Sequence, residues 1–168
     1  MNPGGENMTS PRLRLNDGVR LEGVRVLVVD DAHYVRDVVA EILTQDGAKV
    51  TAVGSADEAL TALQWERPDV LLSDLSMPGK GGYWLIGQVR ALPPEHGGAT
   101  PAAALTAYTG PEHCASVLRA GFQLHVEKPV ALDALISAVA ILALKAHVPE
   151  PLAQGPRAPE EIRRGASR

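Results

Sequence analysis

Three acids, a hydroxyl and an amine in this chain each follow a short apolar run. They are Asp30 and Asp31 after the first run, Asp74 after the second, Thr106 after the third and Lys128 after the fourth. Runs of this length, bounded by turn residues and separated by helix-like stretches, are typical of buried parallel strands. The carboxyl ends of such strands lie along one edge of an open α/β sheet, where ligands bind. We therefore expect these five side chains to meet in one pocket.

The three carboxylates predict a metal site. Left alone they would repel one another, and at least one would be pushed to keep its proton. Magnesium relieves such repulsion, and it prefers one or two carboxylates together with waters and phosphate oxygens. Asp30, Asp31 and Asp74 therefore predict a Mg²⁺ site that a phosphoryl group completes. For Asp30 and Asp31 alone, capping of the following helix is the alternative.

The same residues could carry phosphoryl transfer. A carboxylate can act as a nucleophile and become an aspartyl phosphate, and the reaction needs positioning and charge neutralisation more than proton movement. Asp74 is the natural nucleophile, because it ends the central strand. Lys128 would supply a movable positive charge, and the Thr106 hydroxyl could donate to a phosphoryl oxygen. Taken singly, Thr106 is also typical of a turn, and Lys128 of an exposed lysine.

The stretches between these strand ends predict helices, so the chain is expected to form five βα units. Gly47 and Gly121 are expected to end helices, Ser55 with Glu58 forms a capping-box pattern, and Pro111 suits a first turn. This alternation indicates an α/β fold, a doubly wound parallel sheet with helices on both faces. The expected inward-facing residues of four helices are Val35, Val38, Val39, Ile42 and Leu43; Ala59, Leu60 and Leu63; Leu85, Ile86 and Val89; and Leu132, Leu135, Ile136, Val139 and Leu142.

Composition excludes several classes of protein. Apolar residues make up 45% of the 168 residues, which suits a globular domain, and the net charge of -4 argues against nucleic-acid binding. The single cysteine, Cys114, allows no intrachain disulfide. The apolar stretch 134–144 is too short to span a bilayer, and no charged-then-apolar leader opens the chain. A cytoplasmic protein without membrane association is the expectation.

The chain divides into three parts by composition. Residues 1–22 are expected to form an arm, flexible or with a weak hairpin around Asn16-Asp17-Gly18. Residues 23–148 would form the domain. Residues 149–168, rich in proline and charge, predict a disordered tail that is too short and polar for an output domain.

Four motifs together resemble the receiver domain of two-component response regulators. They are Asp30-Asp31, Asp74-Leu75-Ser76-Met77-Pro78-Gly79, Thr106-Ala107-Tyr108 and Lys128-Pro129, within about residues 24–147. The resemblance implies a flavodoxin-like (βα)5 fold with strand order 2-1-3-4-5.

It further implies that a histidine kinase or a histidine phosphotransfer protein phosphorylates Asp74. Mg²⁺ would be bound by Asp31, Asp74 and the backbone carbonyl of Ser76, with Asp30 acting mostly through water. Such a domain is not an enzyme beyond its own phosphorylation and dephosphorylation. In the family, a threonine like Thr106 moves toward the new phosphoryl group. The face of the fourth helix, fifth strand and fifth helix then serves an unidentified downstream protein or a homodimer.

The chain also departs from the family pattern. The switch position three residues before Lys128 is usually aromatic, and here it is His125. The loop Gly79-Lys80-Gly81-Gly82 has a lysine and glycines where an acidic residue is common, so we expect a more flexible loop. The stretch 120–130 is most similar to receivers of hybrid histidine kinases. The chain is thus either a single-domain regulator or a hybrid-kinase receiver fragment in a phosphorelay.

Two other functions are weighed against this interpretation. A phosphohydrolase working through an aspartyl phosphate usually has a second acid two residues after its nucleophile, where this chain has Ser76. A doubly wound nucleotide-binding domain would carry a glycine-rich phosphate loop after its first strand, where this chain has Asp30 and Asp31. Both patterns disfavour these alternatives.

Overall fold

The structure is a computed structural model that describes residue 18 and residues 20–147. Most of the expected arm, including Asn16 and Asp17 of the hairpin pattern, and the tail lie outside the described residues. The division into arm, domain and tail therefore stays a prediction. In chain order the elements are β1 (Arg25–Val29), α1 (His33–Gln45), β2 (Lys49–Val53), α2 (Ala56–Glu66), β3 (Val70–Asp74), α3 (Gly82–Ala91), the 3-10 helix η1 (Pro94–His96), β4 (Ala102–Thr106), α4 (Pro111–Ala120), β5 (Leu124–Glu127) and α5 (Leu132–Ala146).

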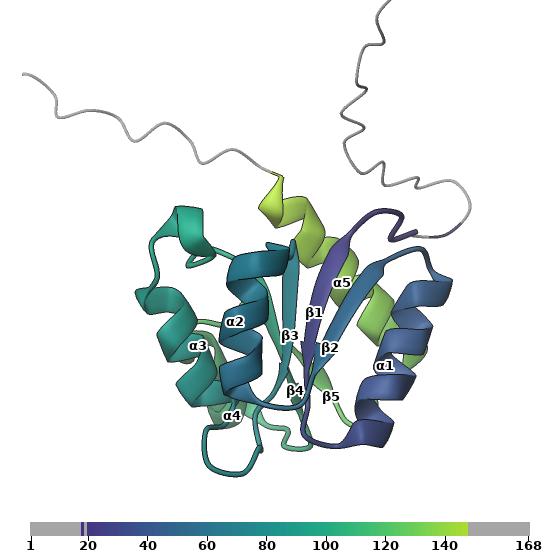
Figure 1. The fold of residues 1–168 in the computed structure, drawn as a ribbon. Helices are drawn as coiled ribbons and strands as arrows, with labels where there is room; N and C mark the ends of the chain where they lie inside the picture. Colours follow the sequence, from purple (N-terminus) through teal and green to yellow (C-terminus); the bar gives the residue numbers. More distant parts are fainter. Residues whose placement is uncertain (1–17, 19, 148–168) are drawn as a thin grey trace, which may run out of the picture.

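The five strands form one parallel sheet in the order β2-β1-β3-β4-β5, as predicted. Every residue of β3 and β4 is buried, which explains why these strands read as continuous apolar runs. Asp74 pairs with Leu105, and Thr106 pairs with Glu127. All strands thus end at one edge of the sheet, the lower edge in Figure 1.

Helices cover both faces of the sheet. Helices α1 and α5 lie against one face, and α2, α3 and α4 lie against the other (Figure 1). The alternation of side chains along β1 serves both layers, because Val26 and Val28 pack in the first core cluster while Leu27 and Val29 pack in the second. The chain joins the core at Leu21, which is fully buried and whose N–H donates to the carbonyl of Asp46 (2.9 Å).

Most of the expected inward-facing residues are buried. Two of the predictions were wrong: Val38 is 36% exposed and Leu132 is 52% exposed. Val38 lies at the margin of the apolar face of α1, whose buried residues are Val39 and Leu43. Leu132 is the first residue of α5, and burial on this helix begins only at Leu135.

The helix ends follow the expected local rules with one change. Gly47 and Gly121 adopt positive φ angles, +98° and +118°, after α1 and α4. The Ser55 hydroxyl oxygen accepts the N–H of Glu58 (3.2 Å), as a capping box requires. The Glu58 carboxylate accepts the N–H of Gly54 (3.1 Å), one residue earlier than the capping-box pattern predicts.

Arg90 joins two loops at the edge of the sheet opposite to the strand ends. Its guanidinium donates to the carbonyls of Gly98 and Thr100 (both 2.8 Å) and of Gly121 (2.8 and 3.0 Å). It also contacts the side chain of Gln123 (3.3 Å), which in turn accepts the N–H of Ala102 at the start of β4. Burial lowers the pKa of Arg90.

We predict that Arg90→Met lowers the free energy of unfolding by about 2–4 kcal/mol, because it leaves several half-buried carbonyls without donors. Urea unfolding followed by circular dichroism measures the change. Arg119→Met is the matched control, since Arg119 is exposed and contacts Ser116 at 3.4 Å. An Arg90→Met protein as stable as the control would contradict the role assigned to these hydrogen bonds.

Candidate functional site

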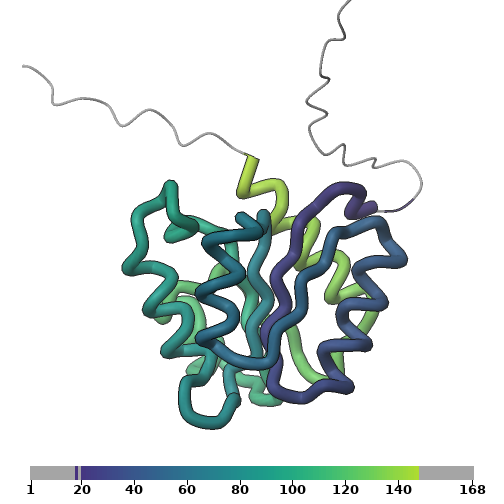
Figure 2. The backbone as a smooth tube through the Cα atoms, in the orientation of Figure 1, coloured from purple at the N-terminus to yellow at the C-terminus, as the bar shows by residue number. Residues whose placement is uncertain are grey.

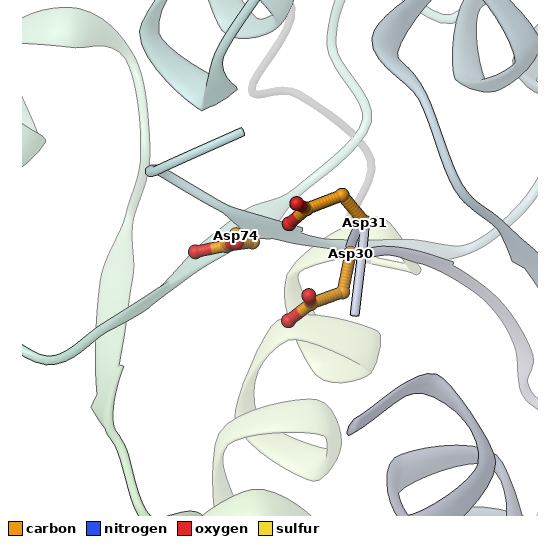
Figure 3. Close-up of side chains that lie close together, drawn as sticks. All are labelled: Asp30, Asp31 and Asp74. Atoms are coloured by element: carbon orange, nitrogen blue, oxygen red, sulfur yellow. The ribbon is translucent and has the colours of Figure 1, made fainter. Parts of the chain in front are cut away.

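The structure brings the three predicted acids together. Asp30 and Asp31 follow β1, and Asp74 ends β3, the adjacent strand. One carboxylate oxygen from each residue lies within 4.8 Å of the others (Figure 3). Among the described residues this is the one group of three or more acidic, histidine or cysteine side chains close enough to share a metal ion.

Asp30 is fully buried and uses both carboxylate oxygens. Oδ1 accepts the N–H of Ala32 (2.9 Å), and Oδ2 accepts from the ammonium of Lys128 (2.7 Å). The first bond closes the turn before α1, but it does not cap the helix, because the N-cap of α1 is Ala32 and no side chain caps it. The second bond ties the residue after β1 to the residue after β5.

Asp74 is only 5% exposed. Its Oδ1 accepts the N–H of Ser76 (3.1 Å) and lies 3.2 Å from the Lys128 ammonium. Burial raises the pKa of Asp74, and the nearby charge of Asp30 raises it further. The hydrogen bond from Ser76 and the charge of Lys128 oppose the shift without cancelling it. A buried carboxylate with a raised pKa at a ligand-binding sheet edge is typical of a functional group.

Lys128 lies between the two buried carboxylates. Burial alone would lower its pKa, but the hydrogen bonds and charges of Asp30 and Asp74 outweigh this effect, and the pKa of Lys128 is raised. Three carboxylates and one ammonium leave a formal charge of -2 at the cluster. The peptide bond between Lys128 and Pro129 is cis.

The third acid of the cluster, Asp31, and the predicted backbone ligand Ser76 lie nearer the surface. Asp31 is exposed, so its carboxylate is accessible from solvent. Ser76 is also exposed, at the start of the loop that projects beyond the sheet between β3 and α3 (Figure 2). That loop returns close to the strand end, since a side chain at Gly82 would collide with the carbonyl of Asp74.

Thr106 is 2% exposed at the end of β4. Its hydroxyl oxygen accepts the N–H of Tyr108 (3.1 Å), which is the local turn bond that the alternative reading expected. The same oxygen lies 3.0 Å from Nε2 of His113 on α4. His125 contacts α4 as well, with its Nε2 3.5 Å from Sγ of Cys114. Among the described residues, no hydrogen bond joins the side chain of Thr106 or of His125 to the three carboxylates.

Some residues of the site escaped the sequence reasoning. Arg36 donates to the carbonyl of Asp30 (2.7 Å) and so fixes the turn that carries both acids. Lys80 binds the carboxylate of Asp57 (2.8 and 3.1 Å) and lies over the ring of Trp84 (4.6 Å). These contacts tie the glycine-rich loop to α2 and α3, although its expected flexibility stays a prediction. In the sequence, the feature that could have indicated Arg36 is its position, a basic residue one turn into the helix that follows the two acids.

The geometry is suited to receiving a charged group on a carboxylate. A buried nucleophilic oxygen, two further acids for a cation and an ammonium converge at one edge, which is the set that phosphoryl transfer to an aspartate needs. Comparison with known proteins agrees, because residues 26–140 match the family described as response regulator receiver domain. The chain belongs to this receiver family.

Individual relatives support the assignment. An uncharacterized 14.6 kDa protein of Leptolyngbya boryana, encoded 3′ of sodA1, is 46% identical over 62% of this chain and 79% of its own length. Hybrid signal transduction histidine kinase D of Dictyostelium discoideum is 32% identical over 74% of this chain, which spans only 8% of that kinase. The solved structure of chemotaxis protein CheY4 of Vibrio cholerae has a TM-score of 0.66 and 29% identity, covering 71% of this chain and 98% of its own.

These findings confirm the receiver fold and the resemblance to both single-domain and hybrid-kinase receivers. Receivers generally bind Mg²⁺ through acidic residues, and the described part of this chain offers such a cluster. No helix within residues 20–147 has the length and apolar character that crossing a membrane requires.

The raised pKa of Asp74 predicts a pH-dependent effect of Asp74→Asn. The folded protein binds the Asp74 proton more tightly than the unfolded chain, so ionisation of Asp74 costs stability as the pH rises through its folded pKa. In EDTA, Asp74→Asn should therefore be more stable than the parent at neutral pH. Below the ordinary aspartate pKa of 3.8, where both states hold the proton, the two proteins should become similar.

Thermal unfolding measured across this pH range tests the sign. Asn keeps an acceptor for the N–H of Ser76, so the comparison isolates the charge. A stabilisation that instead grows as the pH falls would contradict the direction of the shift.

Proposed function

We propose that this chain is a phosphorylation-activated signalling receiver that accepts a phosphoryl group on Asp74. The donor is a histidine kinase or a histidine phosphotransfer protein, as its membership of the receiver family suggests. The observation that carries the proposal is the Asp74 carboxylate, buried beside Asp30 and 3.2 Å from the Lys128 ammonium. The chain catalyses only its own phosphorylation and dephosphorylation.

The donor set fits a hard divalent cation. Carboxylate oxygens of Asp30, Asp31 and Asp74 lie within 4.8 Å of one another, and their charge exceeds that of Lys128 by two. Asp31, Asp74 and the carbonyl of Ser76 would hold Mg²⁺ directly, with Asp30 acting through water. When bound, Mg²⁺ neutralises phosphoryl oxygens and orients them.

The protein's own groups complete the work. Asp74 is held in place by the N–H of Ser76, so its second oxygen is the one free to attack. Lys128 is within reach of both buried acids and can shift toward a phosphoryl oxygen as negative charge develops there. Thr106 would donate its hydroxyl proton to the product, and His125 is the second proposed switch residue.

Output through α4, β5 and α5 is supported by the surface of that region. Large apolar side chains of α4, of α5 and of the loop before α4 are exposed. An unidentified downstream protein, or a second copy of this chain, would cover them, and no nucleic acid is required. We propose the cytoplasm as its location, where histidine proteins that have been phosphorylated from ATP are available. The exposed residues are Tyr108 (64%), Leu118 (53%), Ile141 (46%) and Leu144 (51%).

A second candidate is a receiver that passes its phosphoryl group onward inside a hybrid histidine kinase. The similarity to the Dictyostelium kinase favours it, because this chain corresponds to a small part of that protein. The phosphohydrolase alternative has less support, since the position two residues after Asp74 is the exposed Ser76.

Incubation with acetyl phosphate and Mg²⁺ should add one phosphoryl group, measured as a mass increase of the intact protein. Hydroxylamine should remove it, as expected for an acyl phosphate. Asp74→Asn should abolish the increase, because the nucleophile is gone. Asp69→Asn, at the opposite end of β3, is the control that should react like the parent. A modification that survives in Asp74→Asn, or many turnovers of free phosphate, would refute the proposal.

Mg²⁺ should raise the melting temperature of the parent protein, since a ligand that binds the folded state stabilises it. Asp31→Asn should weaken the apparent Mg²⁺ affinity by at least about tenfold, because it removes a charged ligand. Asp37→Asn is the matched control, an exposed acid on α1 whose contact is His33 (3.4 Å). Equal Mg²⁺ responses of the two variants would rule out the assigned ligand.

A further inference from the structure

The hydroxyl of Thr106 contacts helix α4. Thr106 Oγ1 accepts the N–H of Tyr108 and lies 3.0 Å from His113 Nε2. On β4, Leu105 pairs with Asp74 and packs with Val126 and Ala138 of the α5 layer. Side chains alternate along a strand, so Thr106 points instead to the face that α4 covers.

Either Thr106 or His113 can donate the hydrogen bond between them, and the need of the buried hydroxyl for an acceptor decides which one does. Among the described residues, Thr106 Oγ1 has two hydrogen-bond partners, the backbone N–H of Tyr108, which donates, and Nε2 of His113. If Nε2 donated, the hydroxyl proton of a residue only 2% exposed would lack an acceptor. Leaving a buried donor unpaired is costly. The satisfied arrangement has the Thr106 O–H donating to an unprotonated Nε2.

We propose that His113 is a positioning residue that withholds the Thr106 hydroxyl proton from the acid cluster until Asp74 is phosphorylated. This inference rests on the proposed function. A hydroxyl has one proton, so Thr106 can donate to His113 or to a phosphoryl oxygen, but not to both. Phosphorylation must therefore break the bond to His113, and the phosphorylated state gains less than it would without this competitor.

The bond also links the strand end to a loosely held helix. Val117 is the one fully buried residue of α4, whereas α5 buries six. The residue after His113 is Cys114, whose Sγ lies 3.5 Å from His125 Nε2. Two consecutive residues of α4 thus contact both proposed switch residues. Release of His113 removes one of the contacts that hold the first turn of α4 against the sheet.

The fluoride complex of beryllium tests this, because it binds a carboxylate reversibly with the shape and charge of a phosphoryl group. Its affinity in Mg²⁺ reports the stability of the phosphoryl-bound state. His113→Phe keeps a ring beside Tyr108, whose ring centroid lies 5.7 Å away, but removes the acceptor nitrogen. We expect it to bind the complex about threefold to tenfold more tightly, the worth of one lost competing hydrogen bond.

A rescue variant and a coupled variant separate this role from a packing effect. His113→Gln offers Oε1 as an acceptor at a similar reach and should bind within about twofold of the parent. In a Thr106→Val background, His113→Phe should have no effect, because the proton it releases is absent. His96→Phe, an exposed histidine of η1, should leave the affinity unchanged.

Three results would overturn this inference and leave the proposed function standing. They are an affinity for the complex that is unchanged in His113→Phe, an affinity that is weaker in His113→Phe, or an equal gain in affinity when His113→Phe is made in the Thr106→Val background. His113→Leu, which also lacks an acceptor, serves if the phenylalanine variant does not fold. A parent protein that fails to bind the complex in Mg²⁺ would overturn the proposed function, and this inference with it.

Discussion

The structure around this site depends on holding two carboxylates close together where both are buried. Asp30 is fully buried and Asp74 nearly so, on neighbouring strands, and only the ammonium of Lys128 lies between their carboxylates. Removing charges from water is costly unless they are paired and hydrogen-bonded. Each acid accordingly accepts a backbone N–H as well, from Ala32 or from Ser76. On the proposed function, the remaining excess of negative charge would favour the binding of a divalent cation.

The sheet provides this arrangement through register. β1, β3 and β4 are neighbours, and the parallel pairing brings Asp30, Asp74 and Thr106 to one edge although they are far apart in the sequence. Lys128 arrives from β5 through its N–H bond to the carbonyl of Thr106 (2.8 Å). Close backbone approach at Gly82 brings the start of α3 against the end of β3. Rigid strands therefore set the chemistry, while the loops that follow them complete it.

Apolar periodicity and the polar residues at strand ends were enough to predict the alternation of strands and helices and the acid cluster, whereas the sheet order came from the resemblance to the receiver family. Buried parallel strands have a plain pattern, and the four motifs of the receiver family are specific. The side-chain partners that depend on tertiary packing could not be predicted. The contact of His113 depends on how α4 packs beside Thr106. The position of Arg36 one turn into α1 indicates a role near the acids, but its partner is a backbone carbonyl, which a sequence motif does not identify. Val38 and Leu132 had apolar spacing but lie where their helices leave the core.

The same distinction bears on how a signal could leave the site. Residues that bind charge are anchored in the sheet by burial and backbone hydrogen bonds, so a new phosphoryl group cannot move them far. Helix α4 is held differently: Val117 is its one buried residue, and polar contacts at 3.0 Å and 3.5 Å join it to Thr106 at the end of β4 and to His125 within β5. A hydrogen bond contributes on the order of 1 kcal/mol, which is small beside a buried core but large for a helix with so little buried surface. On the proposed function, a change of partner at Thr106 would therefore act on α4 before it acts on the buried acids.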